Sequence, residues 1–329
     1  MMPQLDPVGE WRRVLHHQHI LKDQCLLLAV SGGCDSMVLA HALYLLNQHR
    51  KNKFSWQVAT VDHGLRPEAK DEATHVLTQC ETWGIKGHLL TLKAPTRFEN
   101  GALAWARDAR YEALEELRSQ LHCRFIVTAH HQNDQIETFL LRLGRGAAPR
   151  TLTAMRTQSG NKLRPFLNLS QADIQCFASK HKLPFVTDPT NKDRRHPRTL
   201  LRQDVLPVLQ QVFGKSVYNK IAHTILDMGT DDDYLSTVAD SSYQHGHQTG
   251  SLTHDRWQLP YLRDLPQPIC RRVIWRLLQT LVPNAVQLNR AHLHQTMKLL
   301  HHPQRVALPN DMILFQQGIW IVSEKGKRE

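Results

Sequence analysis

Residues 26–36 read LLLAVSGGCDS, and this stretch decides the expected fold. Its five apolar residues are typical of a buried strand, and the polar residues after them lead directly into a helical pattern. Gly32 and Gly33 let the backbone approach an anion closely, and the free N–H groups of the following helix point toward it. The stretch predicts a phosphate-binding loop between a strand and a helix.

The side chains of this loop fit a nucleotide. Ser31 and Ser36 add hydroxyl donors, and Asp35 can hold a Mg²⁺ ion that bridges phosphates. The loop lacks the lysine that a Walker A loop uses, so transfer of the terminal phosphate is not the implied reaction. In form it resembles the pyrophosphate loop, whose families cleave ATP between the α- and β-phosphates. The side chain of Cys34 is expected to pack behind the turn and to take no part in the chemistry. A Gly-Gly turn without a ligand is the alternative.

Strands and helices alternate from about residue 25 to residue 186. Apolar runs predict strands at 25–30, 57–61, 88–92, 125–129 and 184–186. Helical patterns lie between them at 35–49, 68–83, 101–121, 134–143 and 171–182, and Ser170 with Asp173 forms a capping box before the last. We expect an α/β fold with a parallel five-stranded sheet, helices on both faces and ligands at the carboxyl ends of the strands.

The pattern changes after Pro207. Residues 208–240 are expected to be helical with an interruption near Gly229, and the polar residues 241–250 have the composition of a linker. A basic helical segment at 266–301 precedes two strand-like pieces. The predicted domains are a catalytic domain at 1–210, a helical linker at 211–250 and a small, mostly helical C-terminal domain at 251–329.

The charge balance favours a polyanionic partner. Lys and Arg number 41 against 30 Asp and Glu, which gives a net charge of +11 with neutral histidines. Neutralising the phosphates of a nucleic acid releases condensed counterions, so such a surplus is typical of nucleic-acid-binding proteins. On charge alone, a solvated basic surface without a partner is equally compatible.

The cysteines and the apolar runs indicate in which cellular compartment the protein is expected. Six cysteines are scattered through the chain without a C-x-x-C pair, which argues against a disulfide framework, a zinc site and an iron–sulfur cluster. The sequence has no signal-peptide pattern and no stretch near the roughly 20 apolar residues of a membrane span. We expect a cytoplasmic protein that does not enter a membrane.

Further motifs follow the other predicted strands. Residues 61–66 read VDHGLR and residues 129–138 read AHHQNDQIET; ARDARY stands at 106–111, RPFL at 164–167 and DPTNKD at 188–193. In order and approximate spacing these segments resemble the tRNA(Ile)-lysidine synthetase family over about residues 22–210. The second domain is similar, more weakly, to the first C-terminal domain of that family, and the further C-terminal domain of longer members is expected to be missing.

The resemblance implies an adenine-nucleotide α-hydrolase-like fold and a two-step reaction with ATP and Mg²⁺. ATP first adenylylates the C2 oxygen of the wobble cytidine in an isoleucine tRNA with a CAU anticodon. The ε-amino group of free L-lysine then attacks C2 and expels AMP. A homodimer is compatible with this family.

The nucleotide site is expected to contain the loop and three residues after it: Ser31, Gly32, Gly33, Cys34, Asp35, Ser36, Val61, His63 and Arg110. Arg107 and Arg110 lie three residues apart and can meet the α-phosphate or the tRNA backbone. The alternative is surface pairing with Asp108 and Glu112. His63 would lie beside the nucleotide, where a packing role and a chemical role are equally compatible with the sequence.

Asp134 and Glu137 also lie three residues apart, so both carboxylates share one helix face. They can bind an ammonium, accept a proton or help hold Mg²⁺, and our hypothesis is that they position the substrate lysine. A pair of solvated carboxylates is the alternative. A transition-metal site at His130, His131 and Asp134 is a weaker interpretation. The expected catalytic residues are Asp35, Arg107, Asp134 and Glu137, with Asp35 and Asp134 as the Mg²⁺ ligands.

Arginines are expected to contact tRNA phosphates. Near the chemistry these are Arg145, Arg164, Arg194, Arg195, Arg198 and Arg202; in the second domain they are Arg271, Arg272 and Arg276. Four positions depart from the pattern of the family, namely Leu103, His196, Thr199 and Asp204. They bear on contacts with tRNA or lysine and leave the ATP chemistry unchanged.

Other functions remain open. A pyrophosphate-loop enzyme that puts sulfur on tRNA shares the ATP chemistry, but such enzymes carry sulfur on paired cysteines or a cluster. A ligase for a small metabolite would not need the basic second domain. A catalytically inert RNA-binding module would not need the intact Ser31, Asp35, Asp134 and Glu137.

Overall fold

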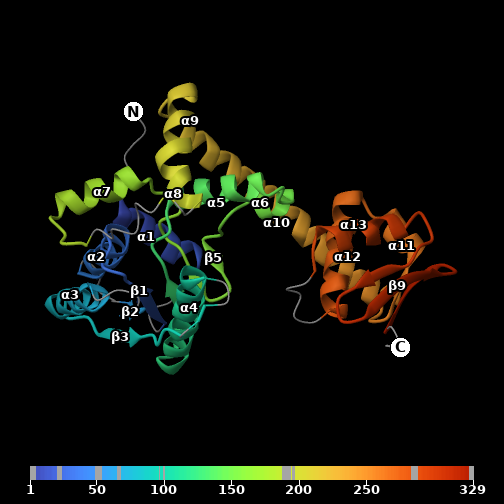
Figure 1. The fold of residues 1–329 in the computed structure, drawn as a ribbon, viewed down its shortest axis with the longest axis horizontal. Helices are drawn as coiled ribbons and strands as arrows, with labels where there is room; N and C mark the ends of the chain where they lie inside the picture. The colour runs from blue at the N-terminus through green and yellow to red at the C-terminus, as the bar shows by residue number, and fades with distance from the viewer. Residues whose placement is uncertain are drawn as a thin grey trace. The chain divides into compact units, whose positions relative to one another are not determined.

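The computed structural model describes residues 5–20, 24–48, 54–64, 68–95, 97–98, 101–186, 194, 197–282 and 288–325. The chain divides into two compact units, Met1–Leu226 and Asp227–Glu329. Each unit has its own hydrophobic core and is described by itself (Figure 1).

The first unit is built on a six-stranded sheet with the order β3-β2-β1-β4-β6-β5. The strands are β1 (Cys25–Ala29), β2 (Ser55–Asp62), β3 (Gly87–Thr91), β4 (Cys123–Val127), β5 (Gln158–Ser159) and β6 (Lys162–Leu163). All pairs from β3 to β6 are parallel, and β5 adds an antiparallel edge. The expected α/β fold with a parallel sheet is confirmed.

The fifth parallel strand is β6, so the strand predicted at 184–186 is wrong. Residues 184–186 form no strand; instead the Val186 N–H donates to the Gly32 carbonyl at 2.9 Å. A three-residue apolar run is too short to reveal whether it pairs with a sheet or packs against a loop. Here the hydrogen bond of Val186 holds the segment after the helix Gln171–Lys180 against the predicted phosphate loop.

Helices cover both faces of this sheet. They are α1 (Pro7–His17), α2 (Cys34–Gln48), α3 (Glu68–Thr82), α4 (Ala102–Gln120), α5 (Gln132–Gly144), α6 (Pro149–Leu152), α7 (Gln171–Lys180), α8 (Pro197–Leu200), the π-helical turn η2 (Leu201–Val205) and α9 (Leu206–Phe213). Along β1, Leu26 and Leu28 pack in the core with α1, α2, α3 and α7, while Leu27 and Ala29 pack with α4. Burial on both faces explains why the strand is apolar at every position.

A cluster of rings lies between α2, α7 and the end of α3. The ring centroid of His41 is 5.4 Å from that of Trp83 and 5.2 Å from that of His181. Its Nδ1 is buried without a hydrogen-bond partner in the described part of the chain. Burial, helped by the charge of His181, lowers the pKa of His41 to about 4.

Replacement of His41 by Phe is expected to reduce the loss of stability in mild acid. The ordinary pKa of 6.5 applies to the unfolded chain, so the unfolded state takes up the proton first as the pH falls toward 4. The free energy of unfolding should therefore decrease over this range, by at most about 1.4 kcal/mol per pH unit from this residue. Urea unfolding at several pH values measures the slope. His17→Phe, at an exposed ring on α1, should keep the wild-type slope, and an unchanged slope in His41→Phe would contradict the assignment.

The second unit combines helices with a small antiparallel sheet. α10 (Val217–Gln248) enters it, and α11 (Leu259–Asp264), α12 (Gln267–Leu281), α13 (Arg290–Leu299), β7 (Arg256–Gln258), β8 (Val306–Leu308), β9 (Met312–Gln317) and β10 (Trp320–Lys325) follow, with the sheet order β7-β10-β9-β8. The helix interruption predicted near Gly229 is wrong, because α10 is continuous as far as Gln248. Residues 241–248, whose composition is typical of a linker, form the last part of this helix. The boundary between the units falls inside this helix.

Two of the three arginines expected to bind tRNA from this unit are used within it. Arg272 pairs with Asp232 at 2.7 Å, and Arg276 pairs with Asp240 while lying 4.5 Å from the Tyr243 ring. These contacts join α12 to α10. No helix in the described residues is long and apolar enough to cross a membrane.

Candidate active site

The predicted phosphate loop lies at the carboxyl end of β1, beside the segment that follows β4. Chain connections leave β1 toward β2 on one side, and β4 lies on the other, so this is the point where the strand order reverses and ligands of such sheets bind. Gly32 has a φ of +84°, a conformation that L side chains rarely adopt. Ser36 is buried, receives the Ser31 N–H at 3.1 Å and donates to the Gly33 carbonyl at 2.9 Å. Ser36 therefore closes the loop from behind.

A cleft of about 490 Å³ opens over this loop, within the size range of nucleotide and cofactor sites. From the loop, Ser31, Gly33, Cys34 and Asp35 line it, whereas Gly32 and Ser36 do not. The remaining lining residues are Val30, Ala59, Thr60, Val61, His63, Ala69, Glu72, Ala73, Ala106, Arg110, Gln171, Gln175, Phe185 and Val186. The expected nucleotide residues Val61, His63 and Arg110 are therefore brought together with the loop.

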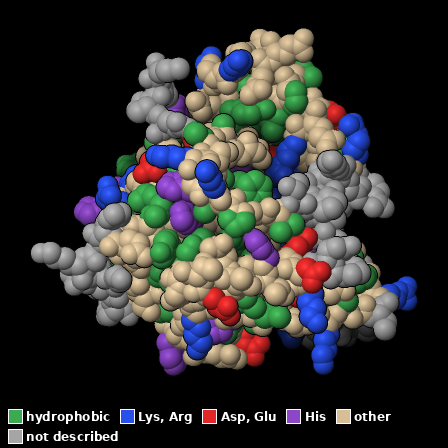
Figure 2. All heavy atoms as spheres, turned by 90° about the vertical axis from the view of Figure 1, so that its left-hand side faces the viewer, with side chains coloured by type: hydrophobic (Ala, Val, Ile, Leu, Met, Phe, Trp, Pro, Cys, Tyr) green, Lys and Arg blue, Asp and Glu red, His purple; other side chains and the backbone are tan. Residues whose placement is uncertain are grey.

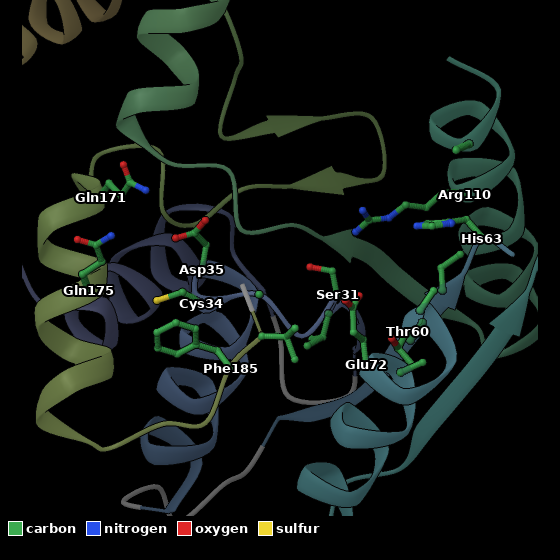
Figure 3. Close-up of a pocket in the computed structure, with 18 residues that line it drawn as sticks. Ser31, Cys34, Asp35, Thr60, His63, Glu72, Arg110, Gln171, Gln175 and Phe185 are labelled. Carbon is green, nitrogen blue, oxygen red and sulfur yellow. The ribbon is translucent and has the colours of Figure 1, made fainter. Parts of the chain in front are cut away.

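Arg110 and His63 lie side by side at one end of the cleft, and Ser31 lies between them and Asp35 (Figure 3). Arg110 comes from α4 and makes no hydrogen bond or ion pair with a described residue, so the alternative of pairing with Glu112 does not apply. Burial lowers the pKa of Arg110. Arg107 is exposed one turn earlier on α4 and does not line the cleft.

His131 connects the loop to α5. Its Nε2 lies 3.7 Å from Asp35 Oδ2 and 3.6 Å from Asp134 Oδ2, while its Nδ1 accepts the Asn133 N–H. Burial acts to lower the pKa of His131, but the nearby carboxylates of Asp35 and Asp134 outweigh it and raise the pKa. His131 thus holds two carboxylates together at the edge of the cleft.

Asp134 and Glu137 are buried, which rules out the alternative of solvated carboxylates. The side chain of Glu137 is 0% exposed and receives two hydrogen bonds from Arg202 of η2, one of them at 3.1 Å from Nη2. The same Nη2 donates to Asp134 Oδ1 at 3.2 Å. Burial raises the pKa of Glu137, and Arg202 acts against that rise. Arg202, one of the arginines expected on tRNA, is 41% exposed and pairs with both buried carboxylates from a π-helical turn, which is of the kind common at functional sites.

Three guanidinium groups converge on His130 from three separate segments. Burial lowers the pKa of His130 to about 4, and the charges of Arg164, Arg198 and Arg110 act in the same direction while that of Asp134 opposes. The His130 Nδ1 lies 2.8 Å from Thr128 Oγ1. The result is a neutral imidazole amid cations, an environment suited to an anion.

The described residues contain no group of three or more metal-ligating side chains able to hold an ion. This removes the transition-metal interpretation of His130 and His131 within that part of the chain. Asp35, whose side chain is 39% exposed, faces the cleft and can contribute one oxygen to a Mg²⁺ that takes its other ligands from phosphates and water.

The arginines expected on tRNA lie in different environments. Arg145 is exposed at the end of α5, Arg198 donates to Thr138 Oγ1 at 3.3 Å, and Arg164 donates to the Arg156 carbonyl while its Nε has no partner in the described segments. Arg194 pairs with Asp204 at 2.5 Å. Asp204, one of the four departures from the family pattern, is therefore the ion-pair partner of this arginine. Arg195 lies outside the described residues, as do His196 and the side chain of Leu103.

One face of the molecule shows how the charges are spread (Figure 2). Lys and Arg side chains are distributed over the coloured surface, and the acidic side chains on it are scattered and do not gather in one patch. An anionic partner meets no concentrated repulsion on this face.

Comparison with known proteins agrees with the interpretation of the loop as a pyrophosphate loop. Residues 10–209 match the PP-loop domain family. A tRNA(Ile)-lysidine synthase from Nostoc is 30% identical over 342 aligned positions, which cover 97% of each chain. The chain belongs to the tRNA(Ile)-lysidine synthase family.

Other members of the family are longer. The tRNA(Ile)-lysidine synthase of Pectobacterium atrosepticum is 38% identical over 56% of this chain, and the match spans 42% of its own length. Among solved structures, the U34-tRNA thiolase NcsA from Methanococcus maripaludis has a TM-score of 0.57 at 15% identity and covers 68% of this chain and 78% of its own. That likeness shows the pyrophosphate-loop fold alone.

The sequence did not reveal Gln171, Gln175 and Phe185 as members of the cleft. The capping box at Ser170 predicted the start of α7 correctly, and the structure has it with Ser170 accepting the Asp173 N–H at 3.1 Å. Ile174, Phe177 and Ala178 of α7 are buried in the core, and the bond from Val186 to Gly32 holds the segment after the helix against the loop; this long-range contact could not be predicted from a local pattern.

Proposed function

We propose that this chain ligates free L-lysine to C2 of the wobble cytidine of an isoleucine tRNA with a CAU anticodon, consuming ATP and releasing AMP and diphosphate. Membership of the family supports a role in lysidine formation. The observation that carries the proposal is the junction of the ATP cleft with a buried carboxylate pair, Asp134 and Glu137, through His131.

In the first step the C2 oxygen of the cytidine attacks the α-phosphorus of ATP, and the bond to the β-phosphate oxygen breaks. Charge develops on the leaving diphosphate, where Ser31 and the N–H groups at the start of α2 face the cleft. Mg²⁺ would supply further charge neutralisation there, with Asp35 as a protein ligand and Asp134 held close by through His131. Arg110, which has no other partner among the described residues, is directed at the α-phosphate.

In the second step the lysine ε-nitrogen attacks C2, loses a proton, and AMP leaves with the electron pair of the C–O bond. A carboxylate pair attracts the ammonium and can take the proton whose loss frees the lone pair of the nitrogen for attack; the second proton leaves after the C–N bond has formed. Arg202 lies on the same pair and is placed to meet the carboxylate of the substrate lysine. Burial lowers the pKa of Arg164, and the charge of the exposed Arg107 acts in the same direction, so these two cations lie near each other and are available to RNA phosphates.

An acid-free stretch supports RNA binding next to the chemistry. Between Glu137 and Asp173 the chain has no Asp or Glu, and it carries six cations: Arg142, Arg145, Arg150, Arg156, Lys162 and Arg164. These residues extend from the end of α5 to the turn after β6, beside the segment that holds His130. Cations near an active site can fix the register of an RNA through its phosphates.

Glu137→Gln is expected to raise the KM for lysine by about tenfold or more and the KM for ATP by less than about threefold. The amide keeps the shape but cannot neutralise an ammonium, and one charged hydrogen bond contributes about 1.5–3 kcal/mol. Steady-state kinetics with each substrate varied in turn measures the split. Glu116→Gln, at an exposed glutamate of α4, is the matched control. Equal effects on both KM values would contradict a role in lysine positioning.

Transfer of sulfur is less well supported. Cys34 is the cysteine that lines the cleft, and burial, together with the charge of Asp35, raises its pKa to about 11. A thiol that stays protonated is a poor nucleophile and a poor carrier of sulfur. AMP formation that depends on tRNA, without incorporation of lysine, would nevertheless revive this function.

A further inference from the structure

Two glutamines on α7 face the cleft from the side opposite Arg110 and His63. Gln171 and Gln175 are four residues apart, so their side chains lie on one face of the helix. In Figure 3 both lie on α7 at the end of the cleft that holds Cys34 and Asp35, and Ser31 lies between this end and the end with Arg110.

The side-chain amides of both glutamines are available for a ligand. Neither amide makes a hydrogen bond to another residue in the part of the chain that the structure describes, although the main-chain N–H of Gln171 donates to Asn133 Oδ1 at 3.1 Å. Two amides present four N–H donors toward the loop. The bond from Val186 to Gly32 keeps the segment after α7 against that loop.

The two ends of the cleft differ in chemistry. Small side chains, Ala59, Ala69, Ala73 and Ala106, line it together with Thr60 and Val61, and Thr60 lies toward the Arg110 end in Figure 3. They leave room for a flat base beside the strand ends. At the α7 end the described lining residues include no Lys or Arg, so an anion held there relies on neutral donors and on the loop.

We propose that Gln171 and Gln175 bind the β- and γ-phosphates of ATP and retain the diphosphate until it leaves. The inference rests on the proposed use of ATP in this cleft. With the base toward Thr60 and the α-phosphate near Ser31 and Arg110, the polyphosphate continues past the loop toward α7. Neutral amides hold a phosphate by hydrogen bonds without the long-range attraction of a lysine, so they bind the leaving group and still let it dissociate.

The test compares nucleotides that differ only in the phosphates beyond the α-phosphate. Binding of ATP, AMP and inorganic diphosphate to the full chain is measured by calorimetry with Mg²⁺ present and without tRNA or lysine. Gln171→Ala/Gln175→Ala is expected to weaken ATP and diphosphate by about tenfold or more and AMP by less than about twofold. Gln175→Glu, similar in size but anionic, is expected to weaken ATP more than Gln175→Ala does and again to spare AMP.

Lys180→Ala is the matched control, because this exposed residue lies on the same helix and its removal changes the general charge but not the cleft. It should leave all three affinities near wild type, and circular dichroism checks that every variant is folded. Equal weakening of ATP and AMP in the glutamine variants, or no weakening of either, would overturn the inference. Wild-type protein that binds ATP but transfers no lysine would instead count against the proposed function and leave the two glutamines unaffected.

Discussion

Arg202→Met is expected to lower the free energy of unfolding by about 2–3 kcal/mol at pH 8, at or just below the roughly 3–5 kcal/mol that breaking a fully buried ion pair costs. Glu137 is 0% exposed and would lose both hydrogen bonds from the guanidinium, whereas Arg202 itself is 41% exposed, which moderates the cost. Urea unfolding measures the change. The same variant should lose lysine transfer, because Asp134 and Glu137 would no longer be held in register.

A double-mutant cycle separates this pair from general packing. In a Glu137→Gln background the fully buried carboxylate is gone and Arg202 keeps only its 3.2 Å contact with Asp134, so Arg202→Met should cost less than it does in wild type. The cost should also shrink as the pH falls. The pKa of Glu137 is already raised by burial, and the folded state then takes up a proton before the unfolded state does. An equal cost in both backgrounds would show that Arg202 contributes only packing.

Asp35→Asn is expected to reduce tRNA-dependent formation of AMP from ATP by at least about 100-fold. The carboxylate faces the cleft and is placed to hold Mg²⁺ on the leaving diphosphate, and an amide supplies neither the charge nor the same metal affinity. The affinity for AMP, which lacks that diphosphate, should change by less than about threefold. Release of labelled AMP measures the rate.

Asp71→Asn is the matched control for this second experiment. Asp71 is exposed on α3 and does not line the cleft, so the same loss of a carboxylate there should leave AMP formation within about threefold of wild type. Should Asp35→Asn and Asp71→Asn behave alike, Asp35 would have no special part in the chemistry.

The catalytic unit was predictable wherever a local pattern carries the information. Four of the five predicted strands exist within a few residues, because an apolar run between turns is a sufficient signal for a strand buried on both faces. The phosphate loop followed from its glycines and its position between a strand and a helix. The strand at 184–186 failed because three apolar residues carry no periodicity, and the real fifth strand, Lys162–Leu163, is only two residues long.

The part of the site that the sequence missed depends on long-range contacts. Asp134 and Glu137 were expected on one helix face, but that Glu137 is fully buried depends on Arg202, 65 residues later in the chain. The ion pair between Asp204 and Arg194 could not be predicted either, because no local sequence pattern indicates it. Composition gave the net charge of +11, but Arg272 and Arg276 meet carboxylates of α10.

The most direct test of the central claim is incorporation of radiolabelled lysine by the purified protein, with ATP, Mg²⁺ and transcripts of isoleucine and methionine tRNAs that both carry a CAU anticodon. We predict ATP-dependent label on the isoleucine transcript alone, with one AMP released for each lysine attached. AMP release without label would indicate that the nucleophile of the second step is not lysine. The absence of both label and AMP, in protein shown to bind ATP, would contradict the assignment of this cleft to lysidine formation.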